Sequence, residues 1–411
     1  MSASTEKVPF QIPLSTRLQA LKPSSTLAVT ARLKALTAAG VDVVGFGAGE
    51  PDFDTPAHIV EAACNALREG KTRYEPVAGT PEARDAVAEY LGLRTGLTLA
   101  RDNIMISVGG KHSLFLAFMA VLDPGDEVLL PAPYWVSYPE QAKLAGATVR
   151  EIPAGVDNDF KITPQQLREA LSERSRVLVM CSPSNPTGTT YTPGELGALA
   201  QVVEEHPQLV VFSDEIYDRL VYGDTRFASF SSIRPAMQDR TVVFNGLSKA
   251  YAMTGWRVGF TAAPARLIQA MSSLQGQMTS NIASFILAAI PAALQGPQEC
   301  VEVMRSEFAR RAEHIHRRLA AIPGIRCPKP TGAFYVFPDI SGAVFGKRDP
   351  DGKVLKTADE FAASLLEHGR VAVVSGVDFS APNHVRLSFA TSLEQIEEGL
   401  NRFESYLAEL K

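Results

Sequence analysis

The chain has 411 residues, of which 45% are apolar and 21% charged, a composition typical of a folded globular protein. Its formal net charge of −5 offers no basic surface to DNA or RNA, so we expect no nucleic-acid partner. The four cysteines form neither a C-x-x-C pair nor a zinc-type cluster with histidine, which favours reduced thiols in the cytoplasm and argues against a metal site. An apolar secretory segment and a run of about 18 apolar residues are both lacking, so we expect no membrane span.

In chain order, the predicted elements begin with a loose arm and a short helix in the first 25 or so residues. A helix is predicted over 26–40, where apolar residues recur at helical spacing and Gly40 provides a C-terminal cap. Short, almost wholly apolar runs then alternate with helical patterns, which predicts an α/β fold with a mainly parallel sheet between helices. The predicted strands are 103–107, 127–131, 176–180, 209–213, 242–245 and 258–262.

The C-terminal third changes character and predicts a second, smaller α+β domain. A long helical pattern covers roughly 263–320. The segments FYVFPDI, VAVVSG and HVRLSFA then indicate strands, mixed with helices over 357–368 and 393–410. We therefore predict an arm and part of the small domain over 1–49, a large domain over 50–300 and a small domain over 301–411.

The segment NGLSKAYAMTGWRVG carries the strongest chemical signal. Lys249 follows the strand at 242–245, at the sheet edge where open α/β sheets place their ligands. Most lysines are solvated surface charges, but this one has small and polar neighbours, and Arg257 lies eight residues further on. A lysine becomes nucleophilic when its pKa falls in a desolvated site near another cation. Arg257 would complement an anion such as a phosphate.

Two further segments follow apolar strands. In VVFSDEIY, Asp214 could be a helix cap or a buried carboxylate that keeps a pyridine nitrogen protonated, with Tyr217 on the same helical face. In SPSNPTG, turn chemistry explains every residue except Asn185, whose amide could donate to a phenolate oxygen.

Glycines precede the helical run that starts near residue 113, in SVGGKH, and such a turn suits phosphate binding through backbone N–H groups. Arg386, between apolar neighbours in HVRLS, needs an anionic partner. That partner is a structural carboxylate or the carboxylate of a substrate.

Taken together, these segments resemble the class I and II aminotransferases, which are pyridoxal 5'-phosphate (PLP) enzymes of fold type I. The resemblance covers nearly the whole chain and is strongest to the bacterial subgroup Ib aspartate aminotransferases. Seven motifs occur in the family's order, namely AGEPDFDTP, YEPVAGTPEAR, PAPYWVSYP, SPSNPTG, SDEIY, SKAYAMTGWRVG and GAFYVFPD.

The resemblance implies a seven-stranded large sheet, a homodimer and a ping-pong exchange between an amino acid and a 2-oxo acid. Lys249 would bind PLP covalently and move the substrate proton, Asp214 would pair with the pyridine nitrogen, and Tyr217 would contact the phenolic oxygen. Arg386 would hold the substrate α-carboxylate. The remaining implied contacts are Asn185 to the phenolic oxygen, Trp135 to the ring, Gly110, Lys111, Ser248 and Arg257 to the phosphate, Tyr74 from a partner subunit, and Gly49, Trp135 and Asn185 near the substrate.

Two departures from the family's pattern bear on these roles. Gly246 stands where many relatives have a phosphate-binding serine. The region SSLQGQMTSN at 272–281 has no basic residue to hold a distal carboxylate, so Lys22, Thr26 and Lys111 are the candidates for that task.

Other readings stay open at this stage. Aromatic, alanine or prephenate transamination and a PLP-dependent lyase share the fold. A DNA-binding regulator would need more than the roughly 25 residues that precede the family region. The glycines at 45, 47 and 49 read G-x-G-x-G rather than G-x-G-x-x-G, which counts against an NAD dehydrogenase.

Overall fold

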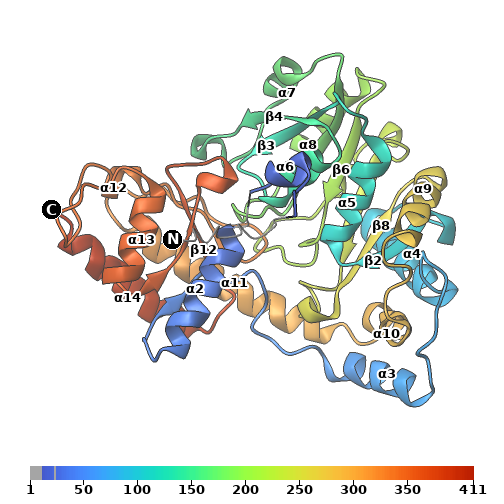
Figure 1. Cartoon of the computed structure of the whole chain (residues 1–411), viewed down its shortest axis with the longest axis horizontal. Coiled ribbons are helices and arrows are strands. Elements are labelled where there is room, and N and C mark those ends of the chain that lie inside the picture. Colours follow the sequence, from blue (N-terminus) through green and yellow to red (C-terminus); the bar gives the residue numbers. More distant parts are fainter. Residues whose placement is uncertain (1–11, 23–24) are drawn as a thin grey trace, which may run out of the picture.

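Seven strands form the central sheet of the computed structural model, which describes residues 12–22 and 25–411 (Figure 1). In order across the sheet they are β2 (Ile104–Val108), β8 (Val258–Ala262), β7 (Thr241–Gly246), β6 (Val210–Asp214), β5 (Ser175–Cys181), β3 (Glu127–Ala132) and β4 (Thr148–Pro153). β8 runs antiparallel to both of its neighbours, and the other pairs are parallel. The predicted α/β fold with a mainly parallel sheet is therefore confirmed.

The six apolar runs of the sequence all form strands of this sheet, whereas β4 gives no comparable signal. β4 is an edge strand with the sequence TVREIP, and Ile152 is its one buried residue. An edge strand needs few apolar side chains, and here the charged residues Arg150 and Glu151 interrupt the apolar pattern by which the sequence would have indicated a strand.

Helices cover both faces of the sheet. Along β5, Val177 and Val179 join one apolar cluster and Leu178 and Met180 join another, as expected for a strand buried on both sides. The first cluster packs against α5, α6 and α9, and the second against α7 and α8. The helices around the sheet are α3 (Ala57–Arg68), α4 (Pro81–Thr95), α5 (Gly110–Val121), α6 (Ser137–Leu144), α7 (Pro164–Ala170), α8 (Pro193–Glu204), α9 (Ala265–Gly276) and α10 (Ser284–Gln295).

A smaller α+β part lies beside the large sheet, at the left of Figure 1. Its antiparallel sheet has the order β11 (Val374–Ser375), β12 (Val385–Ser388) and β9 (Tyr335–Val336). The C-terminal helices are α11 (Glu299–Ala320), α12 (Ser341–Val344), α13 (Ala358–His368) and α14 (Leu393–Glu409). The long helical pattern at 263–320 is thus three helices, with a break between α10 and α11 at Gly296 and Pro297.

The N-terminal segment contacts both parts. α1 (Thr16–Gln19) lies against α6 of the large part, whereas α2 (Ser25–Ala38) packs against β11 and leads to β1 (Val44–Gly45), which pairs in parallel with β10 (Val371–Ala372). Of the predicted arm, residues 1–11 lie outside the described residues. The domain boundary near residue 300 stays a prediction.

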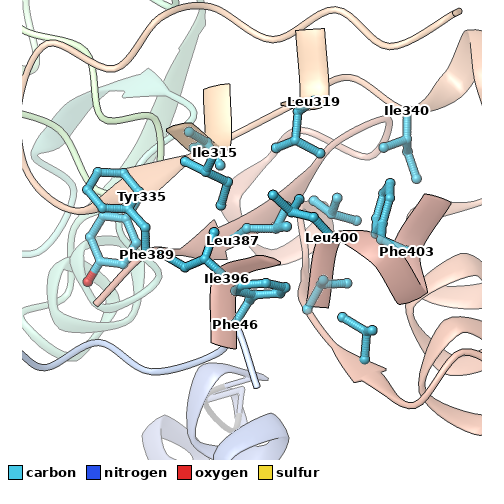
Figure 2. Packing of buried hydrophobic residues seen from close by; sticks show 14 of the residues in the cluster. Phe46, Ile315, Leu319, Tyr335, Ile340, Leu387, Phe389, Ile396, Leu400 and Phe403 are labelled. Atoms are coloured by element: carbon cyan, nitrogen blue, oxygen red, sulfur yellow. The ribbon is translucent and has the colours of Figure 1, made fainter. Parts of the chain in front are cut away.

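Phe46 anchors this N-terminal segment in the core of the smaller part. Figure 2 shows it beneath Leu387, Ile396 and Leu400. Its side chain is 0% exposed, and a Cβ added at Gly399 would lie 2.5 Å from the Phe46 ring. The ring therefore fills the space that this glycine leaves.

Short 3-10 turns complete the fold at Arg101–Asn103, Val156–Asn158, Phe230–Ser232, Pro235–Met237, Thr254–Trp256 and Val377–Phe379. Within the described ranges, no helix has both the length and the apolar character needed to cross a membrane.

We expect Phe46→Ala to lower the free energy of unfolding by about 3–5 kcal/mol, because the substitution loses buried apolar area and leaves a cavity. Chemical denaturation measures the effect. The matched control is Leu93→Ala, since Leu93 is 82% exposed and its removal should change stability by about 0.5 kcal/mol or less. Equal effects of the two substitutions would contradict the anchoring role of Phe46.

Candidate active site

A cavity of about 450 Å³ opens where the carboxyl ends of β5, β6 and β7 meet the smaller part of the molecule. All of the predicted site residues line it except Tyr74. The structure brings together Gly49, Gly110, Lys111, Trp135, Asn185, Asp214, Tyr217, Ser248, Lys249, Arg257 and Arg386. Tyr74 is 91% exposed in this chain and lies outside the cavity wall.

Lys249 follows the end of β7, and its amine lies in the cavity wall. The Nζ atom donates a hydrogen bond to the backbone carbonyl of Gly49. Burial lowers the pKa of this amine to about 8; Glu50 raises it, and the cations Arg386 and Arg257 lower it further. About a tenth of the amine is therefore neutral at pH 7, a far larger share than for an ordinary lysine, and the neutral form is the one that acts as a nucleophile or a base.

Asp214 ends β6 and is buried, with both carboxylate oxygens held. Tyr138 donates its hydroxyl to Oδ2 at 2.6 Å, and the Ile216 amide donates to Oδ1 at 3.3 Å. Burial raises the pKa of this carboxyl, while Tyr138, the Ile216 amide and Lys249 lower it. An ionised group here would need a cationic partner in the cavity.

The predicted helix after Asp214 is wrong. Residues 216–219 form a turn, so Asp214 caps no helix, and Tyr217 shares no helical face with it. The turn nevertheless directs Tyr217 into the cavity, where its hydroxyl lies 3.1 Å from that of Tyr335.

Arg386 is 1% exposed and points from β12 into the cavity. Its terminal nitrogens donate to Asn185 Oδ1 at 2.9 Å and to the Gly47 carbonyl at 3.1 Å, while Nε has no partner. No carboxylate among the described residues forms an ion pair with it, so the structural salt bridge considered above is not found. A buried cation with a spare donor suits an anionic ligand.

Asn185 is oriented by that contact. Because Oδ1 accepts from Arg386, the Nδ2 amide is left as the donor toward the cavity. The amide can therefore donate a hydrogen bond to a phenolate oxygen.

The part of the cavity at the start of α5 is cationic. α5 begins at Gly110, so its first N–H groups are free to hold an anion. Lys111 and Arg257 both line this end, and the Lys111 amine lies 4.9 Å from the Trp135 ring centre. Burial, followed by the charge of Arg257, lowers the pKa of Lys111. A helix start with two cations suits a doubly charged anion such as a phosphate.

The close approach of β8 to the start of α5 depends on glycines. A Cβ at Gly259 would lie 2.3 Å from the Gly110 nitrogen, and one at Gly109 would lie 2.4 Å from Arg257 Nη2. Gly246, which stands in place of the family's serine, has no room for a side chain, since a Cβ would lie 2.5 Å from the Val258 carbonyl. The packing of β7 against β8 therefore leaves no space for a serine side chain at position 246.

Comparison with known proteins agrees with this geometry. The family model "Aminotransferase class I and II" matches residues 41–403. The chain belongs to this family. It is 46% identical to the aspartate aminotransferase of Geobacillus stearothermophilus over 96% of the chain and 98% of that protein.

Two further matches have similar coverage. The aspartate/prephenate aminotransferase of Cereibacter sphaeroides is 45% identical over 97% of the chain and 99% of that protein. The crystal structure of the aspartate aminotransferase from Rhizobium meliloti superposes with a TM-score of 0.94 at 39% identity, covering 98% of this chain and 100% of that one. The protein is thus an enzyme that transfers amino groups.

Sequence reasoning missed several residues that line the cavity of this aminotransferase. Tyr138 and Tyr335 lie within the quoted motifs PAPYWVSYP and GAFYVFPD, so the motifs located them without indicating their contacts. Glu50 likewise lies within AGEPDFDTP, whereas Cys181 and Lys34, which also line the cavity, lie outside the quoted motifs. The positions of these two residues depend on strand register and on the packing of the N-terminal segment, which no local pattern reveals.

Glu215, next to Asp214, is a buried carboxyl outside the cavity wall. Its Oε1 atom accepts hydrogen bonds from Ser213 and Ser229, each at 2.7 Å. Burial raises its pKa to about 8, the two serines oppose the shift, and Asp218 adds to it. The carboxyl is therefore mostly protonated in the folded protein at neutral pH.

This pKa predicts a pH dependence of stability. The folded-state pKa lies above the ordinary value of 4.5, so the folded protein binds the extra proton and loses stability as pH rises from about 5 to about 8. Glu215→Gln cannot ionise and should lack this loss. We expect the Tm of the wild type to fall relative to the variant across that window and to level off above it.

The matched control for this measurement is Glu173→Gln, which replaces an exposed glutamate. Parallel pH profiles for wild type and Glu215→Gln would contradict the protonated state of Glu215.

Proposed function

We propose that this aminotransferase exchanges amino groups between aspartate and 2-oxoglutarate by a ping-pong mechanism with PLP as its cofactor. The observation that carries the proposal is the pairing, in one cavity, of a lysine with a pKa of about 8 and a buried arginine that has no carboxylate partner. The lysine suits a carbonyl cofactor, and the arginine suits an α-carboxylate. The names of the aspartate aminotransferases at 44–46% identity support the choice of aspartate.

The residues that line the cavity fit PLP. Lys249 would attach to it, the Asp214 carboxylate would receive its protonated pyridine nitrogen, and the Asn185 amide and the Tyr217 hydroxyl would face its phenolic oxygen. The phosphate would lie at the start of α5, against Gly110, Lys111, Ser248 and Arg257, with Trp135 beside the ring. When bound, the cofactor supplies an electron sink for the charge that develops on the substrate Cα.

This chain's own groups would then hold the substrate and move its proton. The Arg386 guanidinium would fix the α-carboxylate and so orient the Cα–H bond. The Lys249 amine would take that proton as a base and give it back as an acid in the 1,3-proton shift that transamination requires, a task for which a pKa of about 8 is well matched. The Asp214 carboxylate would stabilise the positive charge on the pyridine nitrogen.

A distal carboxylate needs a cation other than an arginine from 272–281. We propose Lys111 and Lys22, which both line a groove of about 770 Å³ that adjoins the cavity through Lys111. The side chain of the third candidate, Thr26, lies outside the described residues. Prephenate is a second candidate substrate, supported by the aspartate/prephenate aminotransferase that is 45% identical to this chain.

We also propose a homodimer in the cytoplasm. Tyr74 is 91% exposed, yet the family pattern assigns it to a cofactor phosphate. Because Tyr74 is exposed and lies outside the cavity of its own chain, we propose that it contributes to the cavity of a partner subunit.

Lys249→Ala should abolish the visible absorbance of the bound cofactor and lower kcat by at least about 10²- to 10⁴-fold, because both the covalent link and the general base are lost. Absorbance spectra and a coupled assay measure the two effects. Lys356→Ala, at an exposed lysine, is the control. Full activity of the Lys249 variant would refute the assignment.

Asp214→Ala should retain the cofactor but lose about 10²- to 10³-fold in kcat, because the charged partner of the pyridine nitrogen is gone. Half-reactions with aspartate, followed in a stopped-flow spectrometer, measure the loss. An unchanged kcat would rule out this role. Assays without a 2-oxo acid acceptor separate transamination from a lyase, whose turnover needs no acceptor.

A further inference from the structure

Arg386 poses an energetic problem that hydrogen bonds alone do not solve. The guanidinium is 1% exposed, it forms no ion pair with a described carboxylate, and it donates to two neutral oxygens. Burial lowers its pKa, while Tyr335 and Tyr217 act in the opposite direction. A buried cation costs several kcal/mol unless its surroundings compensate it.

Tyr335 supplies that compensation through its aromatic face. The central carbon of the guanidinium lies 4.5 Å from the centre of the Tyr335 ring, with Phe379 further away at 5.3 Å. An aromatic face attracts a cation without using any of its N–H donors. The ring therefore stabilises the charge without occupying any of the guanidinium N–H groups.

Strand register explains why these two side chains meet. Tyr335 of β9 pairs with Ser388 of β12, two residues beyond Arg386. Residues two apart on a strand share a face, so Tyr335 and Arg386 are diagonal neighbours on one side of the small sheet.

The hydroxyl of Tyr335 makes a second, separate contact. It lies 3.1 Å from the hydroxyl of Tyr217, which lines the same cavity. In Figure 2, Tyr335 stands at the edge of the core of the smaller part, and its oxygen points away from Leu387, Ile396 and Leu400. One side chain therefore touches both the group assigned to the substrate carboxylate and a group assigned to the cofactor.

We propose that Tyr335 is a positioning residue with two separable actions. Its ring holds the Arg386 guanidinium charged and correctly oriented for a carboxylate, and its hydroxyl fixes the Tyr217 hydroxyl toward the phenolic oxygen of the cofactor. The second action rests on the proposed function, whereas the first depends only on carboxylate binding. Loss of the ring forces Arg386 to reorganise when a ligand binds, which weakens affinity.

Two substitutions separate the actions. Tyr335→Phe keeps the ring and removes the hydroxyl, and Tyr335→Leu removes both. Tyr222→Phe is the matched control, because it removes another buried tyrosine hydroxyl of the same core, bonded to the Ala333 carbonyl and outside the cavity. Binding of maleate, an unreactive dicarboxylate, is measured by titration calorimetry, and the visible absorbance of the holoenzyme is titrated against pH.

The Kd for maleate should rise roughly 3- to 30-fold in Tyr335→Leu, as expected for the loss of a cation–π contact, and stay within about twofold of wild type in Tyr335→Phe. The pH midpoint of the absorbance titration should move in Tyr335→Phe but not in Tyr222→Phe. Equal maleate affinity of wild type and Tyr335→Leu would overturn the ring's action, as would undetectable binding by the wild type.

An unmoved absorbance midpoint in Tyr335→Phe would overturn the action of the hydroxyl. If Tyr335→Leu fails to fold, an increase above twofold in the maleate Kd of Tyr335→Phe would still overturn the separation of the two actions. A wild type that binds maleate but does not transaminate aspartate would overturn the proposed function alone, because the calorimetric comparison does not involve turnover.

Discussion

The site depends on holding cations near one another without neutralising them. Burial lowers the pKa of Lys249 most, Glu50 raises it, and Arg386 and Arg257 lower it further. Carboxylates paired with Lys249, Arg386 and Arg257 would restore an ordinary lysine pKa and occupy the arginine donors. The fold instead satisfies Arg386 with neutral oxygens and an aromatic face, so the positive potential of the cavity remains available to anionic ligands.

This arrangement requires backbone segments from distant parts of the chain. The Gly47 carbonyl comes from the N-terminal segment, Asn185 follows β5, and Arg386 belongs to β12. Parallel strands gather their carboxyl ends at one edge of the large sheet, which places Asn185, Asp214 and Lys249 together. The small sheet then brings Arg386 against them.

Much of this could be predicted from the sequence, because buried strands and the motifs after them are local signals. The apolar runs located six strands, and the residues after those runs located Asp214 and Lys249. β4 escaped because an edge strand can be largely polar, and the turn after Asp214 was misread as a helix because its spacing fits both. The contact of Tyr335 with Arg386 depends on cross-strand register, which a single sequence does not encode locally.

The pairing of Val44 with Val371 has a consequence for biosynthesis. Every strand of the large sheet lies between residues 104 and 262, so a ribosome exports that whole layer before the partner of β1 has been translated. Until then the Phe46 ring lacks the neighbours that it has in the folded core. Closure of the smaller part is therefore a late event, with a long loop to close between its two ends.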